Sequence, residues 1–245
     1  MNPSEDDVKS GKREDGRRRR WAAHRRARRA AMVGAAIRAI RGHGPSVGMD
    51  DIAAEAGVSK PVLYRYFTDQ ADLYLAVGRN LAEDLLADIT AELDREREPR
   101  ALVAAVVDTY LRTIEEKPEL YRFVVRRAFL DRPVEHDVVT DYGTLIATQL
   151  TRTIGDRMRA LGLDSGAAEP WGHGLVGLVQ AAGDWWLDHP AMSRESLTEY
   201  LTALIWNGFA GVLASAGVRA DEVSSTVRLH AVPDDSGGGE HGAVP

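Results

Sequence analysis

Residues 49–67, MDDIAAEAGVSKPVLYRYF, constrain the fold of this chain more than any other stretch. Apolar residues recur at helical spacing on both sides of Gly57, and glycine is the residue that a tight turn between two helices tolerates best. Ser59 stands where it can cap the second helix, and Pro61 stands in the first turn, where a missing N–H costs little. The stretch therefore predicts two short helices joined by a tight turn, the second over about residues 59–67.

Two interpretations of this pair of helices are open. The first is a helix-turn-helix motif that binds DNA, with the second helix in the major groove and its first residues on the base edges. The second is an ordinary helical hairpin that binds no DNA. In the first interpretation Lys60 reaches guanine acceptors, while Pro61 and Val62 touch thymine methyl groups. The residues of this helix expected at a DNA interface are Ser59, Lys60, Pro61, Val62, Tyr64, Arg65 and Tyr66.

A longer helix is expected before the motif, from about Arg18 to Arg41. Its apolar stripe includes Met32 and Ile40, and the Gly-His-Gly-Pro run at 42–45 is a typical stop signal. This helix is expected to pack behind the motif and support it.

The segment at about 28–75 resembles the DNA-binding domain of the TetR (tetracycline repressor-like) family of bacterial regulators. It departs from the family pattern at Gln70, where a lysine is usual, and at Gly48-Met49, where a hydroxyl residue often caps the first motif helix. The resemblance implies that Tyr64 and Tyr66 give their hydroxyl groups to phosphate, although one of them is alternatively a core residue. The family's residue types recur at Ala53, Gly57, Val58, Ser59, Leu63, Tyr64, Tyr66 and Phe67.

The distribution of charge favours a polyanionic partner for the N-terminal part. The whole chain carries a formal charge of −6. Residues 12–65 nevertheless hold fourteen basic and five acidic residues, a balance of +9 that leaves −15 for the rest. A basic head joined to an acidic body is typical of a DNA-binding module fused to a different kind of domain.

An arginine block opens the chain's basic region. Residues 1–16 are polar and mixed in charge, and we expect them to form a disordered arm. Arg17, Arg18, Arg19 and Arg20 follow. Together with Arg25, Arg26, Arg28 and Arg29, on or before the first long helix, they form a block whose members would repel one another without an anion. We expect them to enter the neighbouring minor groove of DNA, and the alternative is a solubilising tail.

The rest of the chain has helical periodicity and no alternating strand pattern. The expected helices cover about 70–94, 100–115, 118–130, 134–162, 168–188 and 194–216. The fold class is therefore all-α, with an N-terminal three-helix helix-turn-helix domain and a C-terminal helical bundle that, by the resemblance, binds a ligand and dimerises. The predicted domains are a disordered arm at 1–16, a DNA-binding domain at 17–68, a regulatory and dimerisation domain at 69–218 and a flexible tail at 219–245.

The last two helices carry more apolar surface than one bundle face needs. In the family the corresponding pair forms a four-helix interface with its symmetry mate, and the alternative is that these residues form intramolecular core. The residues expected at a homodimer interface are Leu175, Leu178, Trp186, Leu201, Ile205 and Phe209, with Val179, Ala182, Trp185, Leu197, Leu204 and Leu213 on the same two helices.

A pocket for a small effector is expected inside the bundle. Large side chains combined with a few polar groups suit a mostly apolar ligand, and the alternative for each residue is ordinary core. Residues 57–77 also resemble actinobacterial family members that respond to acyl-CoA or other lipid-like effectors. The expected lining residues are Tyr110, Phe123, Phe129, Tyr142, Trp171, His173, Gln180 and Asp184, together with Trp185.

The sequence offers little for catalysis, metal binding or membrane insertion. Gly172, Gly174 and Gly177 spell GxGxxG, but no strand precedes them, so no dinucleotide site is expected. There is no cysteine, no HExxH and no GxSxG, and no stretch reaches the roughly 18 apolar residues of a membrane span. We expect a cytoplasmic protein without cofactor, metal or catalytic residues. A small all-α enzyme using Asp184 and His173 is the remaining alternative of that kind.

These features predict a ligand-responsive transcriptional regulator that binds double-stranded DNA as a homodimer and is not an enzyme. We expect it to act as a repressor that leaves a palindromic operator when a small apolar effector enters the bundle. The alternatives are an activator, a regulator that requires a corepressor, and a nucleoid-type binder with little sequence preference.

Overall fold

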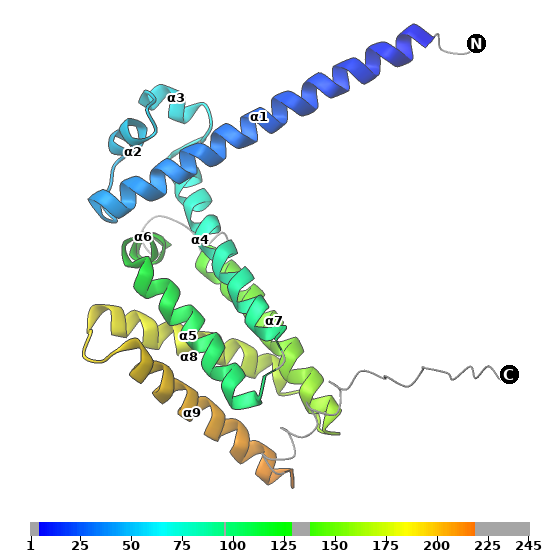
Figure 1. Cartoon of the computed structure of the whole chain (residues 1–245), viewed down its shortest axis with the longest axis vertical. Coiled ribbons are helices and arrows are strands. Elements are labelled where there is room, and N and C mark those ends of the chain that lie inside the picture. Colours follow the sequence, from blue (N-terminus) through cyan, green and yellow to red (C-terminus); the bar gives the residue numbers. More distant parts are fainter. Residues whose placement is uncertain (1–4, 96, 129–137, 219–245) are drawn as a thin grey trace, which may run out of the picture. The chain divides into compact units, whose positions relative to one another are not determined.

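A computed structural model describes the backbone of residues 5–95, 97–128 and 138–218, and the side chains of 20–95, 97–125 and 138–218 (Figure 1). Every regular element in these ranges is an α-helix, which confirms the all-α fold class. The helices are α1 (Glu5–His43), α2 (Met49–Glu55), α3 (Lys60–Tyr64), α4 (Gln70–Leu93), α5 (Pro99–Glu116), α6 (Pro118–Ala128), α7 (Val138–Ala160), α8 (Ala168–Asp188) and α9 (Arg194–Ser215).

The first helix begins much earlier than the sequence pattern predicts. Helix α1 starts at Glu5 rather than at about Arg18, so it also covers most of the arm expected to be disordered. Two features of the sequence account for the extension. Three acidic residues at 5–7 favour a helix N-terminus, and acidic and basic residues recur four apart, as at Glu14 and Arg18. The tail expected at 219–245 lies outside the described residues.

The chain packs as two compact units, which we consider separately. The first comprises residues 1–87 and 112–146, and the second comprises 88–111 and 147–245. By packing, helix α6 therefore belongs with the helix-turn-helix segment, whereas the sequence placed it in a separate domain that begins at residue 69. The reason is the side chain of Phe123 on α6, which is 1% exposed and lies in the core of the first unit.

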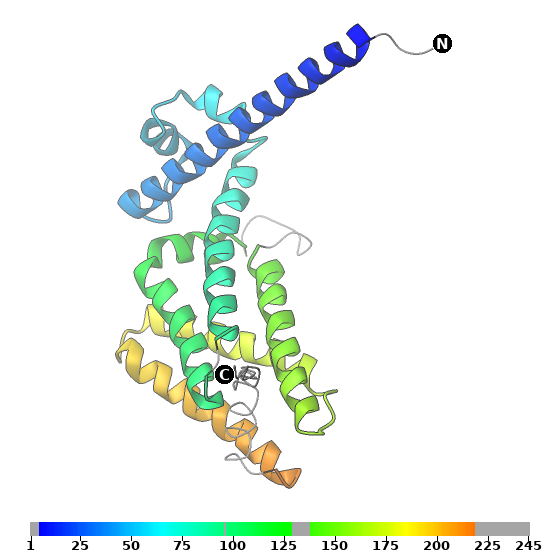
Figure 2. The same ribbon diagram turned by 45° about the vertical axis from the view of Figure 1, so that its right-hand side comes forward.

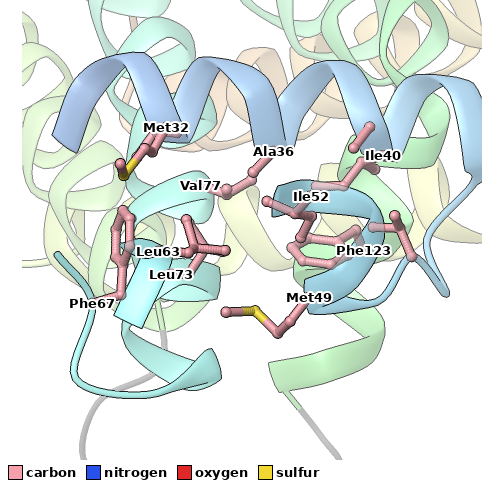
Figure 3. Close-up of a cluster of buried hydrophobic side chains, with 14 of the residues drawn as sticks. Met32, Ala36, Ile40, Met49, Ile52, Leu63, Phe67, Leu73, Val77 and Phe123 are labelled. Atoms are coloured by element: carbon pink, nitrogen blue, oxygen red, sulfur yellow. The ribbon is translucent and has the colours of Figure 1, made fainter. Parts of the chain in front are cut away.

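The core of the first unit holds α1, α2, α3, the start of α4 and α6 together (Figure 3). Phe67, at the end of the α3 segment, and Leu73 and Val77 of α4 are fully buried there. Tyr74 contacts the Phe123 ring edge-on, with ring centroids 4.6 Å apart. The buried residues from α1, α2 and α3 include Met32, Ala36, Ile40, Met49, Ile52, Ala53 and Leu63.

In the second unit, two ion pairs fix helix α5 antiparallel to α9. Arg100 pairs with Glu199, and Asp108 pairs with Arg194, so increasing residue number on α5 matches decreasing number on α9. Helix α8 also contacts α9, because the Trp171 and Phe209 rings meet edge-on at 5.5 Å. The buried apolar residues of this unit include Leu102, Val107, Trp186, Leu197, Leu201 and Ile205.

The GxGxxG run lies on α8, which confirms that no strand precedes it. A Cβ atom on Gly172 would stand 2.7 Å from the carbonyl oxygen of Ala147 and 2.5 Å from the Thr151 hydroxyl oxygen, both on α7. Gly172 is thus required by the close approach of α8 and α7. A Cβ atom on Gly174 or Gly177 would meet nothing within 4 Å.

Candidate nucleic-acid interface

The turn between α2 and α3 depends on Gly57. Its φ of 64° lies in the left-handed region that residues with side chains rarely adopt. In this conformation the Gly57 N–H donates to the Ala54 carbonyl at 3.0 Å, and the Val58 N–H donates to the Ala53 carbonyl at 3.0 Å. The turn therefore closes α2 and leads directly into α3, as the sequence pattern predicts.

The start of α2 compensates for the missing hydroxyl cap. Gly48 occupies the N-cap and has no side chain with which to cap the helix. The Asp51 carboxylate instead accepts a hydrogen bond from the Gly48 N–H at 3.2 Å, which is the reverse half of a capping box. The departure from the family pattern at this position therefore leaves the helix intact.

Helix α3 divides its side chains between solvent and the core. Ser59, Lys60, Pro61, Tyr64 and Arg65 are exposed, while Leu63 is fully buried. Ser59 is the N-cap residue with extended backbone, but among the described residues its hydroxyl makes no capping hydrogen bond. The exposed side chains form the only face of α3 that a ligand can reach.

Val62 and Tyr66 do not belong fully to that face. Both are half-buried and pack against the core of the first unit. Of the two tyrosines, Tyr64 is the exposed one, at 41%. The alternative that one tyrosine is a core residue therefore fits Tyr66 better than Tyr64, and Val62 is less accessible than its neighbours on α3.

Lys60 forms an ion pair within the motif. Its Nζ lies 3.0 Å from Oδ2 of Asp50 on α2, and both side chains are largely exposed. The hydrogen bond to Asp50, together with the carboxylate's charge, raises the pKa of Lys60 above its usual value, so the ammonium is charged at neutral pH. An exposed pair of this kind adds little stability and exchanges readily with another anion.

Arg29 joins α1 to the segment between α3 and α4. Its guanidinium lies 4.6 Å from the centroid of the Phe67 ring and donates to the Asp72 carboxylate at 2.6 Å and to the Tyr66 carbonyl at 3.4 Å. Asp72 also accepts from the Thr68 N–H at 3.2 Å. The end of α3 and the start of α4 are thereby fastened to α1.

Arg29 belongs by sequence to the arginine block, and its basic neighbours did not reveal this structural role. A signal was present, because Arg29 precedes Met32 by three residues and so continues the buried stripe of α1.

The other N-terminal arginines differ from Arg29. Arg17, Arg18 and Arg19 lie on α1, but their side chains are outside the described residues. Arg20 is exposed, and so is every residue from Trp21 to Arg28.

The residues expected to line an effector pocket fall in both units. Phe123 is core of the first unit, and the Tyr142 hydroxyl, also in the first unit, donates to Glu83 at 3.0 Å. Tyr110 lies in the second unit, and Phe129 lies outside the described residues. Helix α8 carries the rest, and His173 is exposed to solvent. Trp171, Gln180 and Asp184 are half-buried.

The residues expected at a homodimer interface separate into buried and exposed groups. Trp186, Leu201 and Ile205 are buried within their own chain, as the intramolecular alternative expects. Leu175 and Phe209 are half-buried. The exposed large apolar residues on the same helices are Leu178 (37%), Trp185 (49%), Tyr200 (64%), Leu204 (60%) and Val212 (42%).

The sequence pattern did not single out Tyr200 and Val212, since a helical period identifies apolar faces but not which face is covered. In the part of the chain that the structure describes, no helix is long and apolar enough to cross a membrane, and no cluster of three or more potential ligands could hold a metal ion.

Two protein families match consecutive parts of the chain. Residues 33–77 match the family described as bacterial regulatory proteins, tetR family, and residues 88–223 match the tetracyclin repressor-like C-terminal domain. Among curated relatives, an uncharacterised HTH-type transcriptional regulator of Mycobacterium tuberculosis strain H37Rv is 39% identical over 204 residues, covering 83% of this chain and 86% of that one. The HTH-type transcriptional activator FasR of Mycolicibacterium smegmatis is 30% identical over 171 residues, covering 68% and 75%.

Solved structures share the fold at low sequence identity. A tetR-family transcriptional regulator from Streptomyces coelicolor superposes with a TM-score of 0.61 at 21% identity, covering 86% of this chain and 91% of that chain. The regulator FadR from Bacillus subtilis, solved in complex with stearoyl-CoA, gives a TM-score of 0.61 at 12% identity, covering 72% and 96%. These likenesses show the fold.

Replacing Arg29 with lysine should weaken the first unit. Lysine keeps the charge but loses the planar contact with Phe67 and the simultaneous donation to Asp72 and the Tyr66 carbonyl. Because the Arg29 and Asp72 side chains are each about one-third exposed, we expect a loss of about 1–2 kcal/mol in the free energy of unfolding. Urea unfolding followed by circular dichroism measures this loss of stability.

The control is Arg28→Lys at the exposed neighbouring position, which should change the free energy of unfolding by less than about 0.5 kcal/mol. Equal losses in both variants would contradict the assigned role.

Proposed function

This chain belongs to the TetR (tetracycline repressor-like) family of bacterial transcriptional regulators, and from that premise we propose that it binds a palindromic operator as a homodimer and leaves it when a small apolar effector binds. Its relatives are regulators rather than enzymes, which supports the expectation that it is not an enzyme. The observation that carries the proposal is the exposed face of α3, defined by Ser59, Lys60, Pro61, Tyr64 and Arg65.

This face has the composition of a DNA contact surface. Lys60 and Arg65 supply positive charge, and Ser59 and Tyr64 supply hydroxyl groups that donate to phosphate oxygens. The first turn carries Lys60 and Pro61, which in a helix-turn-helix unit are the residues nearest the base edges. Lys60 would exchange Asp50 for a guanine acceptor on binding.

Lys60→Ala should reduce discrimination between operator and unrelated DNA. Losing one good contact to a base edge costs about 1–3 kcal/mol, and the dimer loses one in each half-site, so the ratio of the two affinities should fall by at least roughly 30-fold. The operator is obtained by recovering bound fragments from genomic DNA, and both affinities are measured by fluorescence anisotropy at one salt concentration.

The matched control for this substitution is Lys117→Ala, which removes the same charge from a lysine that pairs with Asp84 outside the motif. Its discrimination should equal that of the unsubstituted chain. If Lys60→Ala weakens binding to both DNAs by the same factor, the residue contacts phosphate instead of a base.

The homodimer is supported by an uncovered apolar face on α8. Four residues of α8 share one side of the helix, because they are spaced four, three and four apart: Gly174, Leu178, Ala181 and Trp185. All are exposed, and space beside Gly174 and Gly177 is open. Helix backbones approach each other closely where such small residues meet.

Helix α9 carries a similar face. Tyr200, Leu204 and Gly211 lie on one side, and a Cβ atom on Gly208 or Gly211 would meet nothing within 4 Å. Large exposed apolar residues on adjoining helices are typical of a protein interface. We propose these exposed residues, in place of Trp186, Leu201 and Ile205, as the contacts across a two-fold axis. A two-fold dimer places two α3 helices on half-sites about 34–36 Å apart or a multiple of that.

Leu204→Glu should convert the dimer into monomers, because two carboxylates would be buried near the two-fold axis without partners. Light scattering after gel filtration measures the mass, which is 26.8 kDa for one chain. The control is Leu145→Glu on α7, an equally large leucine that is 50% exposed and lies in the first unit. It should leave the dimer intact. A Leu204→Glu protein that stays dimeric with unchanged affinity would remove Leu204 from the interface.

The effector is proposed to be an acyl-CoA or a related lipid-like molecule that binds the second unit. Supporting this, FadR was solved with stearoyl-CoA, and residues 88–223 match the regulatory-domain family. The second unit also contains two buried hydroxyl groups, on Thr198 and Thr202 of α9, that have no hydrogen-bond partner among the described residues. Such groups can bond the polar end of an otherwise apolar ligand.

Long-chain acyl-CoA should release the operator. Stearoyl-CoA is expected to lower operator affinity, while free CoA at the same concentration should leave it unchanged, since the apolar chain supplies most of the binding energy. By linkage, operator DNA must lower the affinity for stearoyl-CoA by the same factor. Anisotropy of labelled operator measures the first effect and calorimetry the second.

Two other results of this titration are informative. An increase in operator affinity with stearoyl-CoA would identify a corepressor and contradict release. No effect of any chain length would exclude acyl-CoA as the effector. Activation remains the alternative direction of regulation, because the relative FasR is named an activator. Transcription from the recovered operator with and without the protein distinguishes the two.

A further inference from the structure

Helix α1 extends beyond the core that it supports, and part of this extension has no cover. Met32 is the first residue of α1 in the core, with Arg29 half-buried one turn earlier. Residues 20–28 are exposed at all nine positions, and nine residues make two and a half turns, so no face of this stretch packs against described residues. Both views show α1 leaving α2 and α3 behind as one straight helix (Figures 1 and 2).

The uncovered stretch is strongly cationic. Residues 20–28 contain Arg20, Arg25, Arg26 and Arg28 with no acidic residue. Arg25 and Arg28 are three apart and lie on neighbouring positions of the helix surface, where like charges destabilise a helix. An exposed helix with a large excess of positive charge in its sequence gains stability from a polyanion.

Trp21 is the one large apolar side chain in this stretch, and it is 67% exposed. The Arg25 guanidinium lies 5.8 Å from the centroid of its indole ring. Trp21, Arg25 and Arg29 are spaced four residues apart and therefore lie along one side of α1. Arg29 shows which side this is, since it contacts Phe67 and the Tyr66 carbonyl at the end of the α3 segment. Trp21 thus lies on the same side as α3, about 12 Å further along the helix.

The width of a helix decides how this extension can meet DNA. The sequence predicted an arginine arm in the minor groove, which is about 6 Å wide. An α-helix with its side chains is about 10–12 Å wide, so it fits the major groove or lies along the phosphate backbone, but it does not enter a minor groove of that width. Because α1 is helical at Arg20 and its neighbours, this stretch suits the major groove or the phosphate backbone better than the minor groove that the sequence predicted.

We infer that the uncovered stretch of α1, residues 20–28, is a second DNA-contact surface that binds the duplex flanking the half-site read by α3. The arginines contact phosphates there, and Trp21 packs its indole ring against the sugar-phosphate backbone with its N–H available to one phosphate oxygen. Charge complementarity and position beside α3 commit the surface to duplex DNA. The inference rests on the proposed function, because it extends the footprint of a chain that reads an operator.

The test compares two duplexes made from a genomic fragment that the full-length protein protects. One is trimmed to the two half-sites, and the other continues for about 10 base pairs on each side, one further helical turn. The unsubstituted protein should bind the longer duplex more tightly. Trp21→Ala should lose on the order of tenfold in affinity for the longer duplex and leave the trimmed duplex unaffected. Trp21→Phe should retain most of the gain.

Salt dependence separates the two kinds of contact. Replacing Arg20, Arg25 and Arg28 with glutamine in both chains of the dimer should reduce the slope of log affinity against log salt on the longer duplex by about 5, because six phosphate contacts are lost and each contributes about 0.9. Trp21→Ala should leave the slope unchanged. Thermal unfolding should be unaltered in Trp21→Ala, since the side chain is exposed and outside the core.

Other results would overturn the inference. Equal affinity of the unsubstituted protein for both duplexes would show that the flanks are not contacted. Equal loss on both duplexes in Trp21→Ala would place Trp21 within the half-site contact. Failure to recover any protected fragment would instead contradict the proposed function itself, so the two failures are distinguishable.

Discussion

The orientation of the exposed face of α3 depends on one arginine that is not part of that face. Arg29 places a cation over the Phe67 ring while its guanidinium donates to Asp72 and to the Tyr66 carbonyl. Phe67 follows α3 and Asp72 lies in the first turn of α4, so one side chain sets α1, the end of α3 and the start of α4 relative to one another. A five-residue helix has too few internal hydrogen bonds to hold its own orientation. The face of α3 is therefore oriented by tertiary contacts, of which Arg29, Leu63 and Phe67 are the main ones.

The same unit shows how the chain separates stability from recognition. On α3, Leu63 is buried and anchors the helix, while Lys60 and Tyr64 are exposed to solvent. Helix α6 contributes Phe123 to this core, although it is distant in sequence from the motif. The first unit thus includes a segment from outside the matched DNA-binding family region at 33–77. Helix α4 begins in this unit and its residues from Asp88 onward belong to the second.

Much of the fold could be predicted from local sequence signals, because proline and glycine mark most helix ends. Pro99 and Pro118 begin α5 and α6, and Gly57 makes the turn of the motif. What could not be predicted depends on partners that are distant in the chain. The sequence alone does not distinguish one arginine of a basic cluster from another. Arg29 was misassigned because its partner, the ring of Phe67, comes from a distant segment of the chain. On α9 both sides are apolar, so periodicity alone could not show that Leu201 is covered and Leu204 is not. For the candidate site, the sequence predicted which residues lie along α3 and left open which of its two tyrosines is buried, but it did not predict that Val62 packs against the core.

The ion pair between Lys60 and Asp50 has a consequence for searching a genome. Any duplex that approaches α3 must compete with a carboxylate already bonded to the lysine and must approach that carboxylate's negative charge. This penalty is the same for every sequence, whereas only a base that offers a matching acceptor offsets it. Under the proposed function, random DNA would therefore be held less tightly than the charge of the motif alone suggests, and the protein would spend less of its time on the vast excess of incorrect sites.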